Sequence, residues 1–410
     1  MAKINVVKLA LITPALVAAP ACAQSVLPQQ QQAPHVILSA SARGLYDSNI
    51  ARASDAAIAQ RGLEKDDFKM TPLVSADIYK PFGTSYVSLL GSVGYDFHAR
   101  NTILNRERID LTGGIGSQVG PCGANVTGGY DRRQSDLADL NVLTIGTALT
   151  TKNTASIFHV EGLVACGAPV GFKPFATIAY TNSRNSSDRR KGSDANSVTY
   201  GGGILYTQPS IGEIRLFGAQ RDIDFPNRDG VNYFGAPKLR ARFGGVRFER
   251  NIGARLSGHV QVAYTDVLRR GTPATKSFNG VTWELGLNLR ASERLNIDAT
   301  ASRNVDPSLG FNVDYIVQEE YELRAAYVLN RLMTLTVTGT HRSRDFNYSN
   351  TATAIPINND KTNSIVGALR IEPIGRFSLI LDAGYTKRNA DLNFYDYNSF
   401  RTSVTIATQF

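Results

Sequence analysis

The sequence contains very few cysteines, methionines and tryptophans: three Cys, three Met and one Trp in 410 residues. Three Cys are too few for a small scaffold held together by many disulfides. Charged residues make up only 19% of the chain and hydrophobic residues 42%, a composition too apolar for a disordered protein. No run of about 18 apolar residues follows position 23, so the sequence predicts no transmembrane helix.

The first 23 residues predict a secretory signal peptide. Lys3 and Lys8 make its start positive, residues 9–19 form a short apolar core, and residues 21–23 (ACA) fit the small-x-small cleavage rule. Cleavage after residue 23 is the favoured interpretation. A lipoprotein signal with an acylated Cys22 is the alternative, although a proline two residues earlier makes a poor recognition sequence.

A short polar segment at 24–34 is rich in Gln and Pro and predicts a flexible periplasmic tail. From residue 35 to residue 410, apolar and polar residues alternate for about ten positions and a turn then follows. Residues 281–290 show this most clearly, because the odd positions are Val, Trp and three Leu, and the even positions are Thr, Glu, Gly, Asn and Arg. Helical spacing is nearly absent, so the fold class is all-β.

Three features favour a transmembrane barrel over a soluble sandwich. Connections alternate between short and long, Tyr and Phe concentrate near the strand ends, and residues 400–410 alternate up to a terminal Phe410. That ending is similar to the C-terminal signature that the barrel assembly machinery reads. We therefore expect one antiparallel outer-membrane β-barrel over 35–410. It has about 18 strands (range 16–20), short periplasmic turns and longer outer loops, with 142–151 extending a strand above the membrane.

Two cysteines remain after the signal, Cys122 and Cys166. One opens a predicted strand and the other closes the next, so antiparallel pairing would bring both to the periplasmic rim. Facing residues on adjacent strands meet the distance requirement of a disulfide, and the compartment is oxidising. A structural disulfide is favoured, and two free thiols are the alternative.

Inward faces of the predicted strands carry many charged residues, which a membrane barrel tolerates only in a wet lumen or in ion pairs. These residues predict a water-filled pore whose charges set selectivity, and the alternative is a salt-bridge network that fills a closed barrel. The candidate lumen residues are Arg106, Arg108, Arg255, Glu284, Arg290, Arg294, Asp298, Glu320, Glu322, Arg324, Arg342, Arg344, Asp382 and Arg388.

The chain has 44 Lys and Arg against 35 Asp and Glu, an excess that favours anionic solutes. One predicted outer loop is notably basic, and it could bind lipopolysaccharide phosphates or an acidic polysaccharide. An ordinary solvated loop is the simpler interpretation. Its residues are Arg184, Arg189, Arg190 and Lys191. Nucleic acid is not an expected partner, because the chain carries a secretory signal and a barrel pattern.

Candidates for enzyme chemistry are weak. Ser257 and His259 would face the same way on a strand, but a hydrolase also needs an orienting third group. The five His are scattered without metal-ligand spacing, and the glycines at 201–203 lack the strand–helix context and the Lys of a phosphate loop. We expect no enzyme activity, no metal and no cofactor.

Several stretches resemble the outer-membrane β-barrel porin family of proteobacteria, of the type often encoded beside exopolysaccharide genes. They are YDSNI at 46–50, NRER at 105–108, YDRRQSD at 130–136 and the terminal Phe410. The resemblance covers nearly the whole chain and implies a barrel in the outer membrane. It implies no defined substrate and no catalytic residues.

The leading functional hypothesis is passive diffusion of small polar or anionic solutes. The alternative is a non-conducting structural or docking barrel that serves exopolysaccharide export. Expected partners are the lipid bilayer, lipopolysaccharide and the barrel assembly machinery, with an acidic polysaccharide or an export complex as further candidates.

Overall fold

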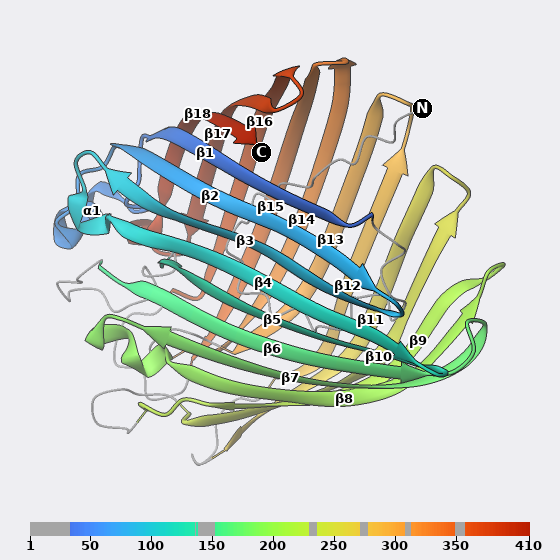
Figure 1. Ribbon diagram of the computed structural model, residues 1–410. Helices are drawn as coiled ribbons and strands as arrows, with labels where there is room; N and C mark the ends of the chain where they lie inside the picture. Colours follow the sequence, from blue (N-terminus) through green and yellow to red (C-terminus); the bar gives the residue numbers. More distant parts are fainter. Residues whose placement is uncertain are drawn as a thin grey trace.

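Eighteen strands form one antiparallel sheet in the computed structural model, which describes residues 33–135, 137, 152–228, 236–270, 278–307, 313–348 and 357–410 (Figure 1). The all-β prediction and the strand count are therefore confirmed. The strands are β1 (His35–Asp47), β2 (Asp67–Phe82), β3 (Ser85–His98), β4 (Arg106–Val119), β5 (Cys122–Gln134), β6 (Thr154–Cys166), β7 (Gly171–Asn185), β8 (Ala195–Gln208), β9 (Gly212–Asp224), β10 (Lys238–Ile252), β11 (Leu256–Arg270), β12 (Phe278–Arg290), β13 (Leu295–Pro307), β14 (Val313–Asn330), β15 (Met333–Tyr348), β16 (Asn359–Ile374), β17 (Phe377–Ala390) and β18 (Tyr397–Gln409).

The sheet closes into a barrel because β1 pairs with β18 as well as with β2. The closing ladder runs from Ser39 opposite Gln409 to Asp47 opposite Arg401. Closure gives each strand a neighbour on both sides, so the sheet has no open edge. This condition must hold for a sheet inside a bilayer, where no water can satisfy a free backbone group.

The connections differ at the two ends of the barrel. At one end, here called the turn end, short turns link β2 to β3, β4 to β5 and so on, and both chain termini of the barrel lie there. Gly83 and Gly120 occupy such turns with φ of 60° and 58°, a left-handed conformation that favours glycine. At the other end, the loop end, the connections are longer, as expected for the outer side of the membrane.

Short helices lie in the loop-end connections. They are α1 (Asp55–Arg61), η1 (Thr102–Leu104), η3 (Asp188–Ser193) and η4 (Asn393–Tyr395). Ser54 caps α1 by accepting a hydrogen bond from the Ala57 N–H, and Gly62 ends it in a left-handed conformation. No helix in the described part of the chain has the length and apolar character needed to cross a bilayer.

Several sequence expectations fall outside the described residues. The signal peptide at 1–23 lies there, and so does the polar tail at 24–34 apart from its last two positions. The proposed strand extension at 142–151 also lies outside them.

Side chains alternate between the two faces of the barrel wall, as the period of a strand requires. The outward face is apolar and open: Val36 is 65% exposed, Leu216 56% and Ile406 59%. Aromatic pairs stand near both ends of this face, Tyr95 with Phe97 at the loop end and Phe172 with Tyr206 at the turn end. An apolar band between aromatic residues is the surface that a lipid bilayer covers.

Cys122 and Cys166 lie directly opposite each other where β5 and β6 meet at the turn end, and they form a disulfide. The register argument from the sequence had placed them at this rim. The bond joins residues 44 positions apart in the chain. It therefore closes the β5–β6 hairpin, including its long loop, in the unfolded as well as the folded protein.

Removing the disulfide should destabilise the barrel without opening it. We expect Cys122→Ser/Cys166→Ser to lose about 3–4 kcal/mol of unfolding free energy, because the unfolded chain regains the entropy of a 44-residue loop. Urea unfolding in detergent micelles measures the change, and heat-modifiable migration on a gel tests that the barrel still closes. Equal unfolding midpoints for the variant and the wild type would contradict the expectation.

The single Trp283 reports which face of β12 meets lipid. Its neighbours two positions away, Val281 and Leu285, are exposed on the outward face, so Trp283 faces outward as well. Brominated lipids should therefore quench its fluorescence strongly. In the matched variant Trp283→Phe/Thr282→Trp the indole should face the lumen, resist brominated lipid and respond to aqueous acrylamide. Equal quenching of both proteins by brominated lipid would show that the register is wrong.

Candidate functional site

The inward face of the wall carries most of the charged residues that the sequence predicted for the lumen. Asp298 on β13 illustrates the placement, because it lies opposite Asn288 and Arg324, while its neighbours Ile297 and Ala299 lie opposite outward residues. By the same register argument, twelve of the predicted residues face the lumen. They are Arg106, Arg108, Glu284, Arg290, Asp298, Glu320, Glu322, Arg324, Arg342, Arg344, Asp382 and Arg388.

Two predicted lumen residues are placed elsewhere. Arg255 and Arg294 lie in exposed turns at the turn end, because β11 begins at Leu256 and β13 at Leu295. The sequence pattern had started both strands one or two residues too early. The lumen prediction was wrong for these two arginines.

The sequence argument also missed many inward charges, mostly on the N-terminal half of the sheet. There the inward positions include many Ser, Ala and Gly, so the alternation is weak and the face of each charge is hard to read. Apolar residues spaced two positions apart could have identified the outward face of these strands, and hence the inward charges between them. The missed residues include Arg43, Lys69, Asp96, Asp131, Arg133, Glu161, Arg215, Arg221, Arg247 and Asp360.

Ion pairs among the described strand residues run along the wall. Lys69 Nζ lies 3.2 Å from Asp96 Oδ2 on the adjacent strand, and Arg43 Nη2 lies 3.3 Å from Asp382 Oδ1 two strands away. Glu284 accepts a hydrogen bond of 2.8 Å from His259 and lies 3.6 Å from Arg247. These pairs hold the charged side chains against the wall and away from the barrel axis.

One ion network is fully buried. The carboxylate of Asp360 on β16 accepts from Arg344 on β15 at 3.0 and 2.6 Å and lies 2.5 Å from Arg388 Nη2 on β17. None of the three side chains is more than 6% exposed. Two guanidinium groups therefore share one carboxylate, and Arg342 lies one inward position from Arg344.

Loop residues cover this network at the loop end. Ile357 and Tyr395 pack on Phe346, which is on the inward face of β15, and all three are at most 5% exposed. Burial also raises the pKa of the Tyr395 hydroxyl. Ile357 and Tyr395 thus lie over the inward face of β15 and narrow the mouth of the lumen.

A second covering cluster lies beside β9 and β10. Phe225 and Ala236 from the connecting loop pack on the inward residues Ile223 and Leu239. Arg228 stacks over the Phe225 ring and donates to the carbonyls of Gly192 and Ala236. Burial, helped by nearby Arg269, lowers the pKa of this guanidinium to about 9. This loop therefore fastens the β9–β10 side of the mouth to the β7–β8 connection.

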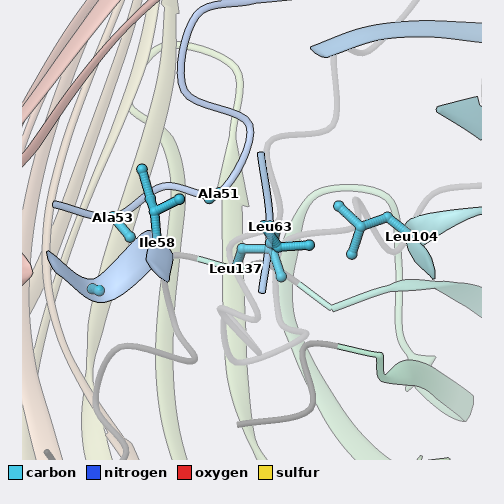
Figure 2. Close-up of a cluster of buried hydrophobic side chains, with 7 residues drawn as sticks. Ala51, Ala53, Ile58, Leu63, Leu104 and Leu137 are labelled. Atoms are coloured by element: carbon cyan, nitrogen blue, oxygen red, sulfur yellow. The ribbon is translucent and has the colours of Figure 1, made fainter. Parts of the chain in front are cut away.

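The loop after β1 joins three other loops through buried apolar side chains (Figure 2). Ile58 and Leu63 from the β1–β2 connection share one buried cluster with Leu104 from the β3–β4 connection and Leu137 from the β5–β6 connection. Ser54 donates a hydrogen bond of 2.7 Å to the Phe394 carbonyl in the β17–β18 connection. A continuous group of loops therefore fixes this side of the mouth.

The waist of the barrel is too wide for its own side chains to fill. Strands spaced by roughly 4.8 Å give eighteen of them a perimeter of roughly 86 Å and a circular width of roughly 27 Å, before strand tilt is counted. Barrels of this size enclose an aqueous space. Closer to the loop end, Asp306 on β13 and Arg221 on β9 both face inward, four strands apart around the sheet.

The predicted basic loop is only partly a loop. Arg184 lies on the outward face of β7, while residues 189–191 lie in η3. Arg190 is 9% exposed, and Lys191 donates to the Asn185 carbonyl. Arg190 is therefore packed into the loop structure, Lys191 stays partly exposed, and the side chain of Arg189 lies outside the described residues.

The described residues bring no catalytic or metal constellation together. Glu284 orients His259, but none of the hydrogen bonds of the described residues joins His259 to Ser257. Among these residues, no three His, Cys, Asp or Glu are grouped as metal ligands. The lumen and its loop-end mouth are therefore the candidate site.

The Asp360 network should make a measurable contribution to barrel stability. We expect Asp360→Asn to lower the free energy of unfolding by about 3 kcal/mol, because two buried guanidinium groups lose their carboxylate. Urea unfolding followed by tryptophan fluorescence measures it. Asp345→Asn is the matched control, since Asp345 is exposed on the outward face of β15. A similar loss in both variants would contradict a special role for the network.

Comparisons with known proteins give fold-level likenesses alone. No family model matches the sequence, and no curated protein matches it. Among solved structures, Pseudomonas aeruginosa OccK2 (OpdF) is 10% identical with a TM-score of 0.48, over 92% of this chain and 98% of that one. Acinetobacter baumannii OccAB3 is 12% identical with a TM-score of 0.47, over 92% and 99%. A BenF-like porin from Pseudomonas fluorescens Pf-5 is 11% identical with a TM-score of 0.47, over 92% and 99%.

At these identities and scores, the likeness carries no conclusion about what passes through this barrel. The chain's own geometry is a closed 18-stranded antiparallel sheet with an apolar exterior and a charged interior. This is the architecture of a bacterial outer-membrane β-barrel.

Proposed function

We propose that the protein is an outer-membrane channel for passive diffusion of small polar solutes, with a weak preference for anions. The observation that carries the proposal is the charged inner wall. Its ion pairs run between strands at most two positions apart around the sheet, so they leave the middle of a wide lumen to water.

The wall charges favour polar solutes over apolar ones. Acidic and basic side chains alternate around the lumen in similar numbers, for example Lys69 with Asp96 and Arg247 with Glu284. Such a wall can replace the water around a polar solute without strongly favouring one sign of charge.

The weak preference for anions comes from the mouth. Arg342, Arg344 and Arg388 lie together there, beside the carboxylates of Asp360 and Glu320. The positive potential there attracts anions at the entrance, and the loops that cover this network limit solute size. Among the described strand residues, basic side chains outnumber acidic ones on the outward face and not on the inward one, so the lumen is less basic than the sequence suggested.

The alternative of a non-conducting docking barrel for exopolysaccharide export finds no support in the comparisons. It differs from the channel in one measurable property, since a docking barrel passes no current.

Planar-bilayer recording of the refolded protein in a salt gradient tests the channel. We expect steady, stepwise conductance with a reversal potential shifted modestly toward anions. Absence of current from protein that is heat-modifiable, and therefore folded, would overturn the proposal and favour a plugged or docking barrel.

Arginine substitutions test whether the inner wall sets ion preference. Arg108→Gln/Arg342→Gln removes two inward charges, so the reversal potential should move toward cations by several millivolts while conductance persists. Arg255→Gln/Arg294→Gln is the matched control, because it removes the same charge from exposed turns that salt screens. Equal shifts in both variants would show that overall charge, not the lumen wall, sets the preference.

A further inference from the structure

The outward face of the barrel is not apolar throughout. At the loop end of β9 and β10, polar residues occupy three successive outward positions, and the outermost row continues through Asn196 and Asn182 onto β8 and β7. The basic residues in and beside these rows, here called the cationic strip, are Arg184, Lys238, Arg240 and Arg242.

The register proves that this strip faces outward. Arg242 lies opposite Gln220 and two positions from Gly244, and the next residue on that face, Val246, is 46% exposed. Arg247, on the opposite face of β10, is 5% exposed and pairs with Glu284 inside the barrel. Lys238 and Arg240 share the outward face with Arg242 because they lie at even steps from it.

Depth along the strand places the strip at a membrane boundary. Between Arg242 and Ile252 there are about ten residues, the length that a tilted strand needs to cross the hydrocarbon core. Tyr200 lies beside Gln220 in the same row as Arg242, and Tyr264 stands one row below that. Aromatic residues mark the interface, so the strip stands at headgroup level on the loop side.

Neighbouring side chains hold the strip in place and leave donors available. Arg240 donates its Nε to Asp222 at 2.6 Å, and Arg242 donates its Nε to Gln220 at 3.2 Å. Arg184 donates to Asn196 at 2.8 Å. These contacts fix the stems of Arg240 and Arg242, and their terminal amino groups remain available for a further acceptor.

The two ends of the outward face differ in charge. Asp222, Asp224 and Asp266, which lies opposite Arg242 on β11, offset three of the four cations of the strip. At the turn end, Lys80 and Arg250 are isolated cations at the opposite boundary. Among the described strand residues, the outward guanidinium groups of Arg240 and Arg242 thus lie together at the loop-side boundary, which suits a membrane whose outer headgroups carry phosphates.

We propose that the cationic strip binds the phosphate groups of lipid A, the membrane anchor of lipopolysaccharide. Guanidinium groups recognise phosphate oxygens through paired hydrogen bonds, and they do so best at a partly dehydrated interface. The inference rests on the outer-membrane placement in the proposed function. It moves the expected lipopolysaccharide contact from the η3 loop, whose Arg190 is buried, to the barrel wall.

Native mass spectrometry of the full barrel in detergent tests the inference, with bisphosphorylated lipid A as the probe and dephosphorylated lipid A beside it. We expect the wild type to retain the phosphorylated lipid preferentially. Arg240→Gln/Arg242→Gln should weaken that binding at least tenfold, since each cation near an anionic lipid adds to the affinity. The matched control Lys80→Gln/Arg250→Gln removes the same charge at the turn end and should bind like the wild type.

Three results would overturn the inference. If the wild type retains both lipids equally, phosphate does not determine binding. If both variants lose the phosphorylated lipid equally, the strip is not its binding site. If the wild type is an oligomer without added lipid and Arg240→Gln/Arg242→Gln is a monomer, the strip forms a contact between copies of the chain. Bilayer conductance of each variant keeps the tests separate, because a folded, conducting barrel without lipid selectivity refutes this inference alone.

Discussion

Backbone pairing is the constraint on which the rest of the structure depends. A strand inside a bilayer cannot leave its N–H and C=O groups unpaired, so the sheet must close, and the β1–β18 ladder closes it. Closure at eighteen strands then fixes the perimeter, and the perimeter leaves a lumen that side chains cannot fill. The aqueous interior is thus a consequence of strand number, and the inward charges are tolerated because of it.

The loop-end connections narrow a lumen that is otherwise too wide to select solutes by size. A waist this wide discriminates poorly, so any selection must occur where the passage narrows. Phe346, Ile357 and Tyr395 narrow the mouth with apolar side chains and bury the Asp360 network beneath them. Because that burial keeps Arg344 and Arg388 from water, the low dielectric strengthens their interaction with the carboxylate of Asp360.

Sequence periodicity predicted the strands well where alternation was strong and failed where it was weak. Residues 281–290 alternate without exception, and Glu284 and Arg290 face the lumen as expected. In β3, by contrast, Leu89 and Leu90 are adjacent and both exposed, so the pattern alone does not show which of them faces lipid. Strand ends were the least certain feature, which explains both the wrong placement of Arg255 and Arg294 and the omission of Asp360. The loop clusters depend on contacts between distant segments, such as Leu137 with Ile58, that no local pattern encodes.

The sorting of charge between the two faces explains why net charge was a poor guide to the lumen. A wet interior accepts charges of both signs if they pair, so acids and bases accumulate there together. The outward face accepts a charge only where the membrane supplies a partner, and phosphates are the partners that an outer leaflet offers. Outward positive charge should therefore collect at the loop-end boundary, where Lys238, Arg240 and Arg242 stand beside Asp222 and Asp266. In such a barrel, a basic composition says more about the phosphates of the surrounding lipid than about the charge of the solute in the lumen.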